Sequence, residues 1–332
     1  MYLISGAAGF IGFHLSMKLL KNKKNVIGID NLNNYYDVKL KKSRLNILKK
    51  NKNFKFFKYD LKKKKKIKEV FKKYKIKYVI NLAAQAGVRY SVINPDAYIS
   101  SNITGFFNIL DLSKEFRVKH FIFASTSSVY GSSNKFPLNE NVAASHPIQL
   151  YAATKRSNEL IAHSYSALYG LPTTGLRFFT VYGPYGRPDM SLFKFVNNIL
   201  KNKKIELFNR GNHFRDFTYV DDIVKSIILL LNKIPKKNKI KNKSFSPDKS
   251  FAPFRILNIG GSSSIKLTKY VSLIEKVLEK KAKKKLLNLQ KGDVLKTQAN
   301  NLKIKNLIKY TPNTKLIDGL KTYIKWFNNY YK

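Results

Sequence analysis

A tyrosine and a lysine one helical turn apart are well suited to proton chemistry. Tyr151 and Lys155 lie in the segment Tyr-Ala-Ala-Thr-Lys, which opens a predicted amphipathic helix over residues 151–169. Positions i and i+4 share one side of a helix, so the two side chains project together. A phenol with a pKa of about 10 is a poor base at neutral pH, but a nearby ammonium favours the phenolate. The pair therefore predicts that Tyr151 acts as a general base on a substrate hydroxyl.

Hydroxyl side chains upstream strengthen this interpretation. The pair alone is a weak signal, because the chain has 20 tyrosines and 64 Lys and Arg residues. A predicted strand over residues 120–125 leads directly into Thr126, Ser127 and Ser128. A hydroxyl cluster therefore precedes the predicted helix by about 25 residues, as chemistry on a hydroxylated substrate would require.

A glycine-rich segment near the N-terminus predicts a dinucleotide site. Gly-Ala-Ala-Gly-Phe-Ile-Gly at 6–12 lies between a predicted strand over 2–5 and a predicted helix over 11–21. Glycine lets the backbone approach a pyrophosphate, and the helix N-terminus offers free N–H groups. Asp30 ends the next predicted strand, close to the spacing of about 20 residues expected for a carboxylate that binds the adenosine ribose. An acid there repels a 2′-phosphate, which favours NAD over NADP.

Strands and helices alternate through the first half of the chain. The predicted elements after this turn are strands over 26–30, 54–59, 78–82, 120–125 and 173–178 and helices over 67–73, 98–114 and 151–169. Further predicted elements are helices over 221–231, 267–278 and 316–331 and a strand over 255–259. This alternation predicts βαβ units and a doubly wound parallel α/β sheet.

The composition favours a globular protein without metal or membrane segments. The 332 residues allow two lobes, and 44% of them are hydrophobic. No apolar run approaches the roughly 20 residues that cross a bilayer, and the first predicted strand begins at once, so we expect a cytoplasmic protein with no membrane partner. Cysteine is absent and the five histidines lack metal-ligand spacing, so no metal site is predicted.

The formal net charge of +45 has two interpretations. A basic stripe would indicate a protein that binds nucleic acid or another polyanion. Here the basic residues are spread over most predicted elements, with the longest run at 62–66, which favours a general lysine bias and no nucleic-acid partner. Since lysine predominates, each arginine is a candidate for a site that needs a planar, two-pronged donor. The arginines of most interest are Arg89, Arg177, Arg187 and Arg215.

Together these motifs resemble the extended branch of the short-chain dehydrogenase/reductase superfamily. The resemblance implies a Rossmann sheet that binds NAD, with a smaller C-terminal substrate lobe. It also implies that Thr126 hydrogen-bonds the reacting hydroxyl, so that Thr126, Tyr151 and Lys155 form the catalytic set. The cofactor-binding residues that it implies are Gly6, Gly9, Phe10, Ile11, Gly12, Asp30, Asn31, Asp60, Leu61, Leu82, Ala83, Ala84, Gln85, Asn102, Tyr151 and Lys155.

Longer segments resemble the NAD-dependent sugar-nucleotide epimerases, in particular those that act on UDP-glucuronate. The matching segments are 30–40, 83–91, 175–184, 186–190 and 215–222. Related dehydratases have Thr-Asp-Glu, and related decarboxylases Thr-Ser-Glu, where residues 126–128 here are Thr-Ser-Ser. The missing acids argue against elimination and dedicated decarboxylation. The resemblance therefore implies oxidation at C4, rotation of the keto sugar and return of hydride to the opposite face, with NAD recycled.

The same resemblance implies contacts to a UDP-sugar. The hydroxyls would hold a uronate carboxylate, Arg215 the diphosphate, Arg187 the diphosphate or the uronate, and Asp293 the uridine ribose. For Arg89 the alternative is that it fixes a loop to an acid, and Glu159 on the Tyr151 helix is expected to be a surface acid. The implied substrate-binding residues are Arg89, Ser127, Ser128, Thr180, Arg187, Arg215 and Asp293.

The resemblance implies two lobes within each chain and a dimer of two chains. Residues 1–178 would form the NAD-binding domain, to which 216–260 return, and 179–215 with 261–332 would form the nucleotide-sugar lobe. The helices near 98–114 and 151–169 would pair in a homodimer. Two alternatives remain open: an epimerase of UDP-glucose or UDP-N-acetylglucosamine, and a polyanion-binding protein without catalytic activity on a Rossmann scaffold.

Overall fold

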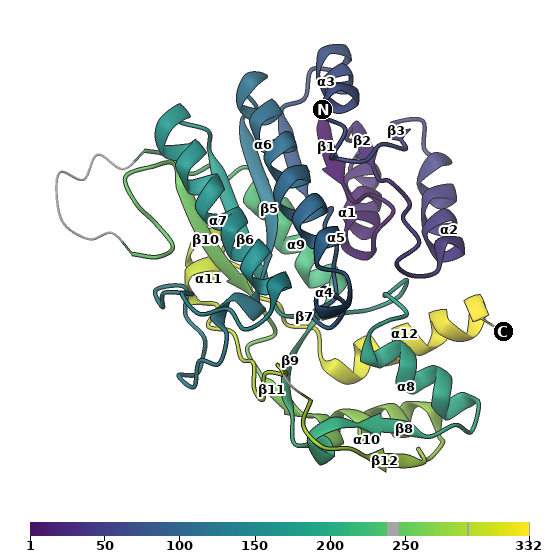
Figure 1. The fold of residues 1–332 in the computed structure, drawn as a ribbon. Helices are drawn as coiled ribbons and strands as arrows, with labels where there is room; N and C mark the ends of the chain where they lie inside the picture. The colour runs from purple at the N-terminus through teal and green to yellow at the C-terminus, as the bar shows by residue number, and fades with distance from the viewer. Residues whose placement is uncertain (238–245, 291, 332) are drawn as a thin grey trace.

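A computed structural model describes residues 1–237, 246–290 and 292–331. Seven parallel strands form its central sheet in the order β10-β6-β5-β4-β1-β2-β3 (Figure 1). The strands are β1 (Tyr2–Ser5), β2 (Val26–Ile29), β3 (Phe54–Phe57), β4 (Tyr78–Asn81), β5 (His120–Thr126), β6 (Thr173–Phe178) and β10 (Phe254–Ile259). The predicted doubly wound parallel sheet is confirmed. Most of these strands are continuously buried, as expected where helices cover both faces.

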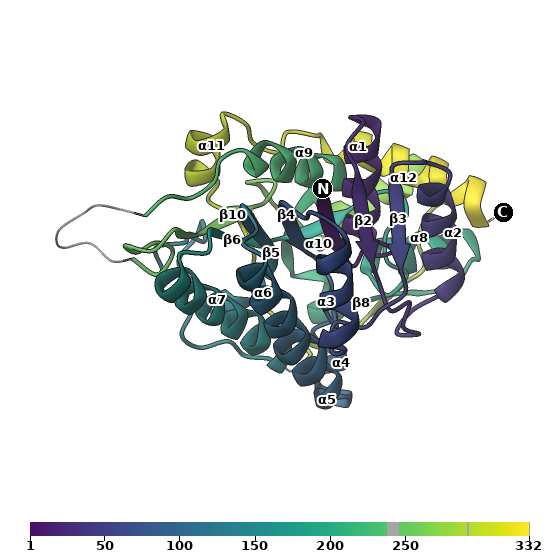
Figure 2. The ribbon, with the colours of Figure 1, turned by 90° about the horizontal axis from the view of Figure 1, so that it is seen from above.

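Helices cover the sheet on two sides (Figure 2). On one side lie α1 (Phe10–Lys21), α2 (Val38–Lys49), α9 (Val220–Leu231) and α11 (Leu302–Ile308), which share a core with β1, β2 and β6. On the other side lie α3 (Lys64–Lys73), α6 (Gly105–Glu115) and α7 (Leu150–Tyr169) over a second core. None of the helices described is long and apolar enough to span a membrane.

The predicted helix over 98–114 is divided in the structure. It comprises α5 (Pro95–Tyr98), the π-helical turn η1 (Ile99–Thr104) and the α-helix α6. A π-turn often marks a functional region, because the widened backbone re-aims its side chains. The short helix α4 (Tyr90–Ile93) precedes this group. Helix α2 was not predicted from the sequence; five of its twelve residues are lysine or arginine.

Smaller elements build a second lobe at one end of the sheet (Figure 1). They are β7 (Thr180–Tyr182), β8 (Ile205–Leu207), β9 (Phe214–Tyr219), β11 (Ser264–Lys266), β12 (Lys284–Leu286), α8 (Ser191–Leu200), α10 (Leu267–Leu278) and α12 (Leu316–Tyr331). Strands β11, β9 and β7 form one sheet and β12 and β8 another, around a separate apolar core.

The edges of this lobe differ from the predicted ranges 216–260 and 261–332. Strand β9 pairs with β7 and β11, so residues 216–219 belong to the small sheet. Helix α11 instead packs on the main sheet, because Ile304 and Ile308 are buried in the core that contains α1 and α9. The chain therefore crosses between the lobes more often than the sequence predicts.

Candidate active site

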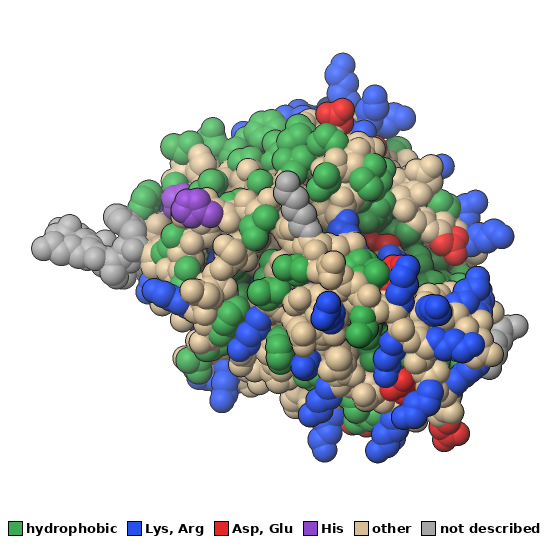
Figure 3. Space-filling view, turned by 60° about the horizontal axis from the view of Figure 1, so that its bottom comes forward, with side chains coloured by type: hydrophobic (Ala, Val, Ile, Leu, Met, Phe, Trp, Pro, Cys, Tyr) green, Lys and Arg blue, Asp and Glu red, His purple; other side chains and the backbone are tan. Residues whose placement is uncertain are grey.

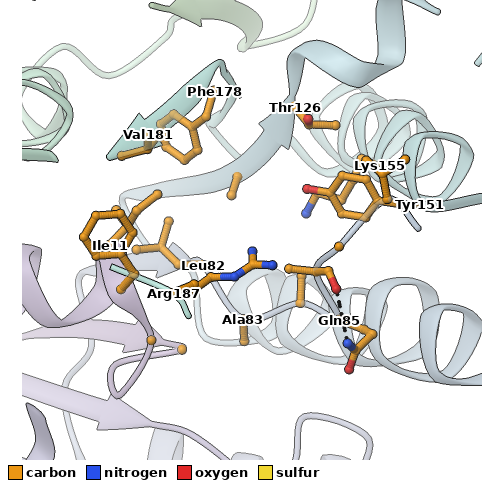
Figure 4. Close-up of a pocket in the computed structure, with 18 of the residues that line it drawn as sticks. Ile11, Leu82, Ala83, Gln85, Thr126, Tyr151, Lys155, Phe178, Val181 and Arg187 are labelled. Atoms are coloured by element: carbon orange, nitrogen blue, oxygen red, sulfur yellow. Dashed lines mark hydrogen bonds between the residues drawn. The ribbon is translucent and has the colours of Figure 1, made fainter. Parts of the chain in front are cut away.

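A pocket of about 450 Å³ lies at the carboxyl ends of the central strands. Its walls come from the turns after β1, β2, β4 and β5, from the start of α7 and from the second lobe (Figure 4). This end of an open parallel sheet is where α/β proteins bind ligands. All of the predicted site residues line this pocket except Asn102 and Arg89.

The glycine turn has no room for side chains. A Cβ on Gly12 would lie 2.1 Å from the Gly6 carbonyl oxygen, and one on Gly6 would lie 2.8 Å from the backbone nitrogen of Ala83. Gly6 also has a φ of +74°, in the left-handed region that glycine tolerates. Gly9 is the N-cap of α1 and supplies no capping side chain. The first-turn N–H groups of α1 are therefore free to receive an anion.

Asp30 lines the pocket directly after β2. Its carboxylate accepts hydrogen bonds from the backbone N–H groups of Ala8 (3.1 Å) and Leu32 (2.8 Å). Burial raises its pKa, against the opposing effect of these bonds and of Lys41. The Lys41 ammonium donates to the Asn33 carbonyl oxygen at 2.7 Å, and burial lowers its pKa to about 8. Lys41 lines the pocket and was not predicted from the sequence.

Asn102 acts behind the pocket wall. It is buried, accepts from the Gln85 N–H at 2.7 Å, and donates to the Gln85 carbonyl at 3.1 Å and to Thr154 Oγ1 at 3.0 Å. It therefore fixes the backbone of Gln85 from outside the pocket lining, and its predicted contact with the cofactor stays a prediction. Asn31 and Asp60, also predicted, meet each other at 3.0 Å between Nδ2 and Oδ2.

Tyr151, Lys155 and Thr126 converge in the pocket (Figure 4). Burial raises the pKa of Tyr151, while the charge of Arg187 and a hydrogen bond with Thr126 lower it. Arg187 is therefore a further positive charge that acts on Tyr151, and the role expected of Lys155 toward the phenol stays a prediction. The Lys155 side chain is 3% exposed, and burial lowers its pKa to about 8. Its ammonium has no hydrogen-bond partner among the residues described, so it can donate to a ligand.

Glu159, expected to be a surface acid, is completely buried. Its carboxylate accepts two hydrogen bonds from Arg177 at 2.8 Å, one from Arg156 at 2.8 Å and one from Ser125 at 2.6 Å. These cations and hydrogen bonds outweigh burial and lower its pKa. The expectation is wrong because one helical turn beyond Lys155 the helix still faces the sheet. Arg177 does meet the planar acceptor that its residue type suggests.

The hydroxyl cluster contains no acid. Thr126 Oγ1 accepts from the Ser128 N–H and lies 3.2 Å from Ser128 Oγ, at the start of the 3₁₀ turn η2 (Ser127–Tyr130). Ser127 and Thr180 line the same part of the pocket. The carboxylates that line the pocket elsewhere are Asp30, Asp60 and Asp293. On the side of the hydroxyl cluster, the space beside Tyr151 is thus bordered by neutral donors.

Arg187, Asp189 and Tyr35 form a cluster, hereafter the Arg187 cluster. Arg187 donates through Nε to Asp189 Oδ1 (2.9 Å) and through Nη2 to Oδ2 (2.5 Å), and the Tyr35 hydroxyl donates to the same Oδ2 at 3.1 Å. Its guanidinium points into the pocket in Figure 4, and its charge acts on both Tyr151 and Lys41. The cluster therefore joins the loop after β2 to the loop after β7 across the pocket.

At the far end, Arg215 and Asp293 line the pocket. Arg215 Nη1 donates to the carbonyl oxygens of Phe214 (3.0 Å) and Leu295 (3.2 Å). Within the described part of the chain, Arg215 forms no ion pair with a carboxylate. Arg89 lies outside the lining and pairs with Asp293 at 3.2 Å. Its alternative interpretation, an arginine that fixes a loop to an acid, therefore matches this geometry.

Comparison with known proteins identifies the family of this chain. Residues 2–242 match the model of the NAD dependent epimerase/dehydratase family. The chain belongs to this family. It is 49% identical to protein CapI of Staphylococcus aureus, over 99% of both chains, and 43% identical to a UDP-glucuronate 4-epimerase of Thermodesulfobacterium geofontis, over 98% of this chain and 95% of the relative.

A solved structure of a family member resembles the whole chain. It is the UDP-glucuronic acid 4-epimerase of Bacillus cereus in complex with UDP-glucuronic acid and NAD, with a TM-score of 0.88, 32% identity and 99% coverage of both chains. Another structure of that enzyme carries a tyrosine-to-phenylalanine mutation and contains UDP-4-deoxy-4-fluoro-glucuronic acid and NAD.

The family's cofactor fits the residues of this chain. The turn at Gly6 and Gly12 has no room for a Cβ atom, and the start of α1 lacks a side-chain cap. Lys155 presents a buried ammonium without a partner among the described residues. NAD is the cofactor of this chain.

Proposed function

We propose that the protein is a UDP-glucuronate 4-epimerase, which interconverts UDP-glucuronate and UDP-galacturonate. The observation that carries this proposal is the acid-free hydroxyl cluster of Thr126, Ser127 and Ser128 beside Tyr151 and Lys155. A dehydratase needs acids at that place, and a neutral-sugar epimerase has no carboxylate to hold. The full-length relatives named UDP-glucuronate 4-epimerase agree with this choice.

Tyr151 is the proposed base for the C4 hydroxyl. Burial raises the pKa of Tyr151 in the ligand-free site, and the Arg187 charge and the Thr126 hydrogen bond oppose this effect by favouring the phenolate. NAD, when bound, accepts a hydride from C4 and returns it to the opposite face of the transient 4-keto sugar. Thr126 holds the hydroxyl in line, and Lys155 places its ammonium beside the phenol and the cofactor pocket.

The hydroxyls have a second proposed task, which is to hold the uronate carboxylate. A 4-keto uronate is a β-keto acid and loses CO₂ when its carboxylate turns perpendicular to the carbonyl plane. Ser127, Ser128 and Thr180 offer neutral donors that fix the carboxylate in another orientation without adding a charge.

The nucleotide is proposed to lie against the second lobe. Arg215 would receive the diphosphate with the guanidinium nitrogens that its backbone contacts leave free, and Asp293 would accept from the uridine ribose. The substrate lobe is then 179–219 with 261–299 and α12, and the remaining segments form the NAD domain.

We also propose a homodimer that works in the cytoplasm. Helices α6 and α7 expose the large apolar side chains Phe107, Leu160, Leu168 and Tyr169. Phe107 contacts Tyr165, which contacts Tyr169, so aromatic contacts join the two helices on this face. A second copy of the chain would cover it.

One experiment tests the choice of substrate. The purified protein is incubated separately with UDP-glucuronate, UDP-glucose and UDP-N-acetylglucosamine, and the products are resolved by NMR. We expect conversion of the uronate alone. Conversion of a neutral sugar without the uronate would favour the alternative epimerase, and no conversion of any sugar by NAD-loaded protein would favour a binding protein.

A further inference from the structure

Asp216 is a buried carboxylate behind the nucleotide end of the pocket. It lies in β9, is completely inaccessible to solvent, and does not line the pocket. Its carboxylate accepts from the N–H groups of Ala299 (2.8 Å), Gly261 and Ser262. No cation pairs with it within the described ranges of the chain. Burying a carboxylate without a cation costs folding free energy, so we asked what the hydrogen bonds of Asp216 hold in place.

Those contacts tie down one segment of the pocket wall. Residues 292–299, hereafter the strap, supply Asp293, Val294 and Thr297 to the lining. Asp216 holds the strap twice, because its N–H donates to Thr297 Oγ1 at 3.2 Å and its Oδ2 accepts from Ala299 N–H. The preceding residue in β9, Arg215, donates to the strap carbonyl of Leu295.

Two glycines make space for this carboxylate. A Cβ on Gly260 would lie 2.9 Å from Asp216 Oδ2, and one on Gly261 would lie 3.0 Å from Oδ1 and 2.4 Å from the Phe217 carbonyl oxygen. Both glycines follow β10, the edge strand of the main sheet. Asp216 therefore links the main sheet, the small sheet and the strap at one point.

We propose that Asp216 is a positioning residue for the nucleotide half of the substrate. By fixing the strap against β9, it sets the separation between Asp293 and Arg215, the two groups proposed to hold the uridine ribose and the diphosphate. This inference rests on the proposed function only in taking a nucleoside diphosphate as the ligand at that end. The reacting end, at Tyr151 and Lys155, has no contact with Asp216.

The test compares Asp216→Asn and Asp216→Ala with the wild type. We expect the Kd for free UDP and the KM for UDP-glucuronate to rise about tenfold or more, which corresponds to one lost charged hydrogen bond. The kcat is expected to change less than twofold and the NAD content not at all, since the lost binding is shared by ground and transition states. Because Asn keeps one acceptor oxygen, Asp216→Asn should be less impaired than Asp216→Ala.

A matched control separates positioning from general stability. Asp222 on α9 is another buried carboxylate bonded by neutral donors, the Tyr310 hydroxyl and the Thr314 N–H, and it lies outside the pocket. Asp222→Asn should lower the free energy of unfolding and leave Kd and KM unchanged. If the Asp216 variants do not fold, Thr297→Val removes one of the two ties in a milder way, and we expect about a threefold rise in the Kd for UDP.

Two results would overturn the inference. One is a wild-type Kd for UDP in folded Asp216 variants or, if those variants do not fold, in Thr297→Val. The other is a fall in kcat alone with an unchanged KM. Because UDP binding is read without turnover, a wild-type protein that binds UDP but does not epimerise UDP-glucuronate would contradict the proposed function and leave this inference standing.

Discussion

Lys155 combines a buried position with a charge that lacks a partner among the described residues. Burial lowers its pKa from 10.5 to about 8, so the folded protein holds the ammonium at a cost on the order of 3 kcal/mol at pH 7. Such strain in a binding site is common, because the groups that bind a ligand are left unsatisfied without it. The residue should therefore oppose stability and support activity.

We expect Lys155→Met to abolish epimerisation and to raise the free energy of unfolding by about 1 to 3 kcal/mol at pH 7. The gain should shrink as pH rises from about 8 to 10.5, since the folded wild type loses its proton before the unfolded chain does. Urea unfolding of NAD-free protein at several pH values measures this, because bound NAD would itself stabilise the fold. A variant less stable than the wild type at pH 7 would contradict the prediction.

The proposed role of Ser127 and Ser128 predicts which product forms, and not how fast the enzyme works. Replacing both with alanine removes neutral donors from the proposed carboxylate site, and each such bond contributes about 0.5 to 1.5 kcal/mol. We expect the share of turnovers that release CO₂ to rise about tenfold, or the KM for the uronate to rise by a similar factor. Trapped CO₂ and NMR of the sugars measure the two outcomes.

The control for this variant is Ser132→Ala, an exposed serine just beyond the cluster that does not line the pocket. It should leave both quantities unchanged. If the double variant matches this control, the serines do not hold the carboxylate.

Several residues of the site were invisible to sequence reasoning, each because its role depends on a distant partner. Lys41 resembles many other lysines until the fold places it beside Asp30. Glu159 follows Lys155 by one helical turn, a signal that it faces the sheet, yet only the fold supplies Arg177 as its partner. Tyr35 meets Asp189 from a segment far along the chain. The motif residues were found because their spacing is local.

At the scale of elements, long periodic segments were predictable and short ones were not. The strands β1, β5 and β6 are bounded by turn residues and lie within one residue of their predicted limits. The three-residue strands β8, β11 and β12 carry too little pattern to distinguish them from loops. The π-turn η1 also escaped prediction; its residue Asn102 is hydrogen-bonded to the distant Gln85, a contact that no local sequence pattern shows.

The turn between β1 and α1 gives a prediction at this scale. Gly12→Ala would place a methyl group 2.1 Å from the Gly6 carbonyl, so α1 must move away from the turn. We expect purified Gly12→Ala protein to lose most of its bound NAD and several kcal/mol of stability, in the range of other strained or overpacked sites. Absorbance of released NAD and thermal unfolding measure these effects.

Gly170→Ala is the matched control for the glycine turn. Gly170 follows α7 with a φ of +67° and lies outside the pocket, and a Cβ there would meet only the Lys237 side chain, at an ordinary contact distance of 3.6 Å. Its substitution should cost about 1 kcal/mol of stability and leave the NAD content unchanged. Equal NAD loss in both variants would show that the effect of Gly12→Ala is not specific to the cofactor.

At the scale of the whole molecule, charge and apolar surface point to different partners. Lysine and arginine side chains are spread over the face in Figure 3 and do not form one stripe there. Helices α6 and α7 instead expose Phe107, Leu160, Leu168 and Tyr169, and Tyr165 joins Phe107 to Tyr169. Self-association through these helices thus has a clearer structural basis than binding of a polyanion.

We expect light scattering to give twice the mass of the chain for the wild type. The double variant Leu160→Glu/Leu168→Glu should give the mass of one chain, because charge on an apolar interface is poorly tolerated. Leu302→Glu is the control: Leu302 is equally exposed but begins α11, on the other side of the sheet (Figure 2). A wild type that is monomeric at micromolar concentration would refute the proposed dimer.

The Arg187 cluster has a consequence for how the protein acquires its cofactor. Tyr35 and Arg187 both line the pocket and are joined through Asp189, from segments that come together only in the folded chain. We expect a dinucleotide in this pocket to pass that cluster, and so to enter most easily while the chain is still folding. We therefore expect the supply of NAD during synthesis to set how many molecules become active, while the rate of each active molecule stays independent of the NAD concentration around it.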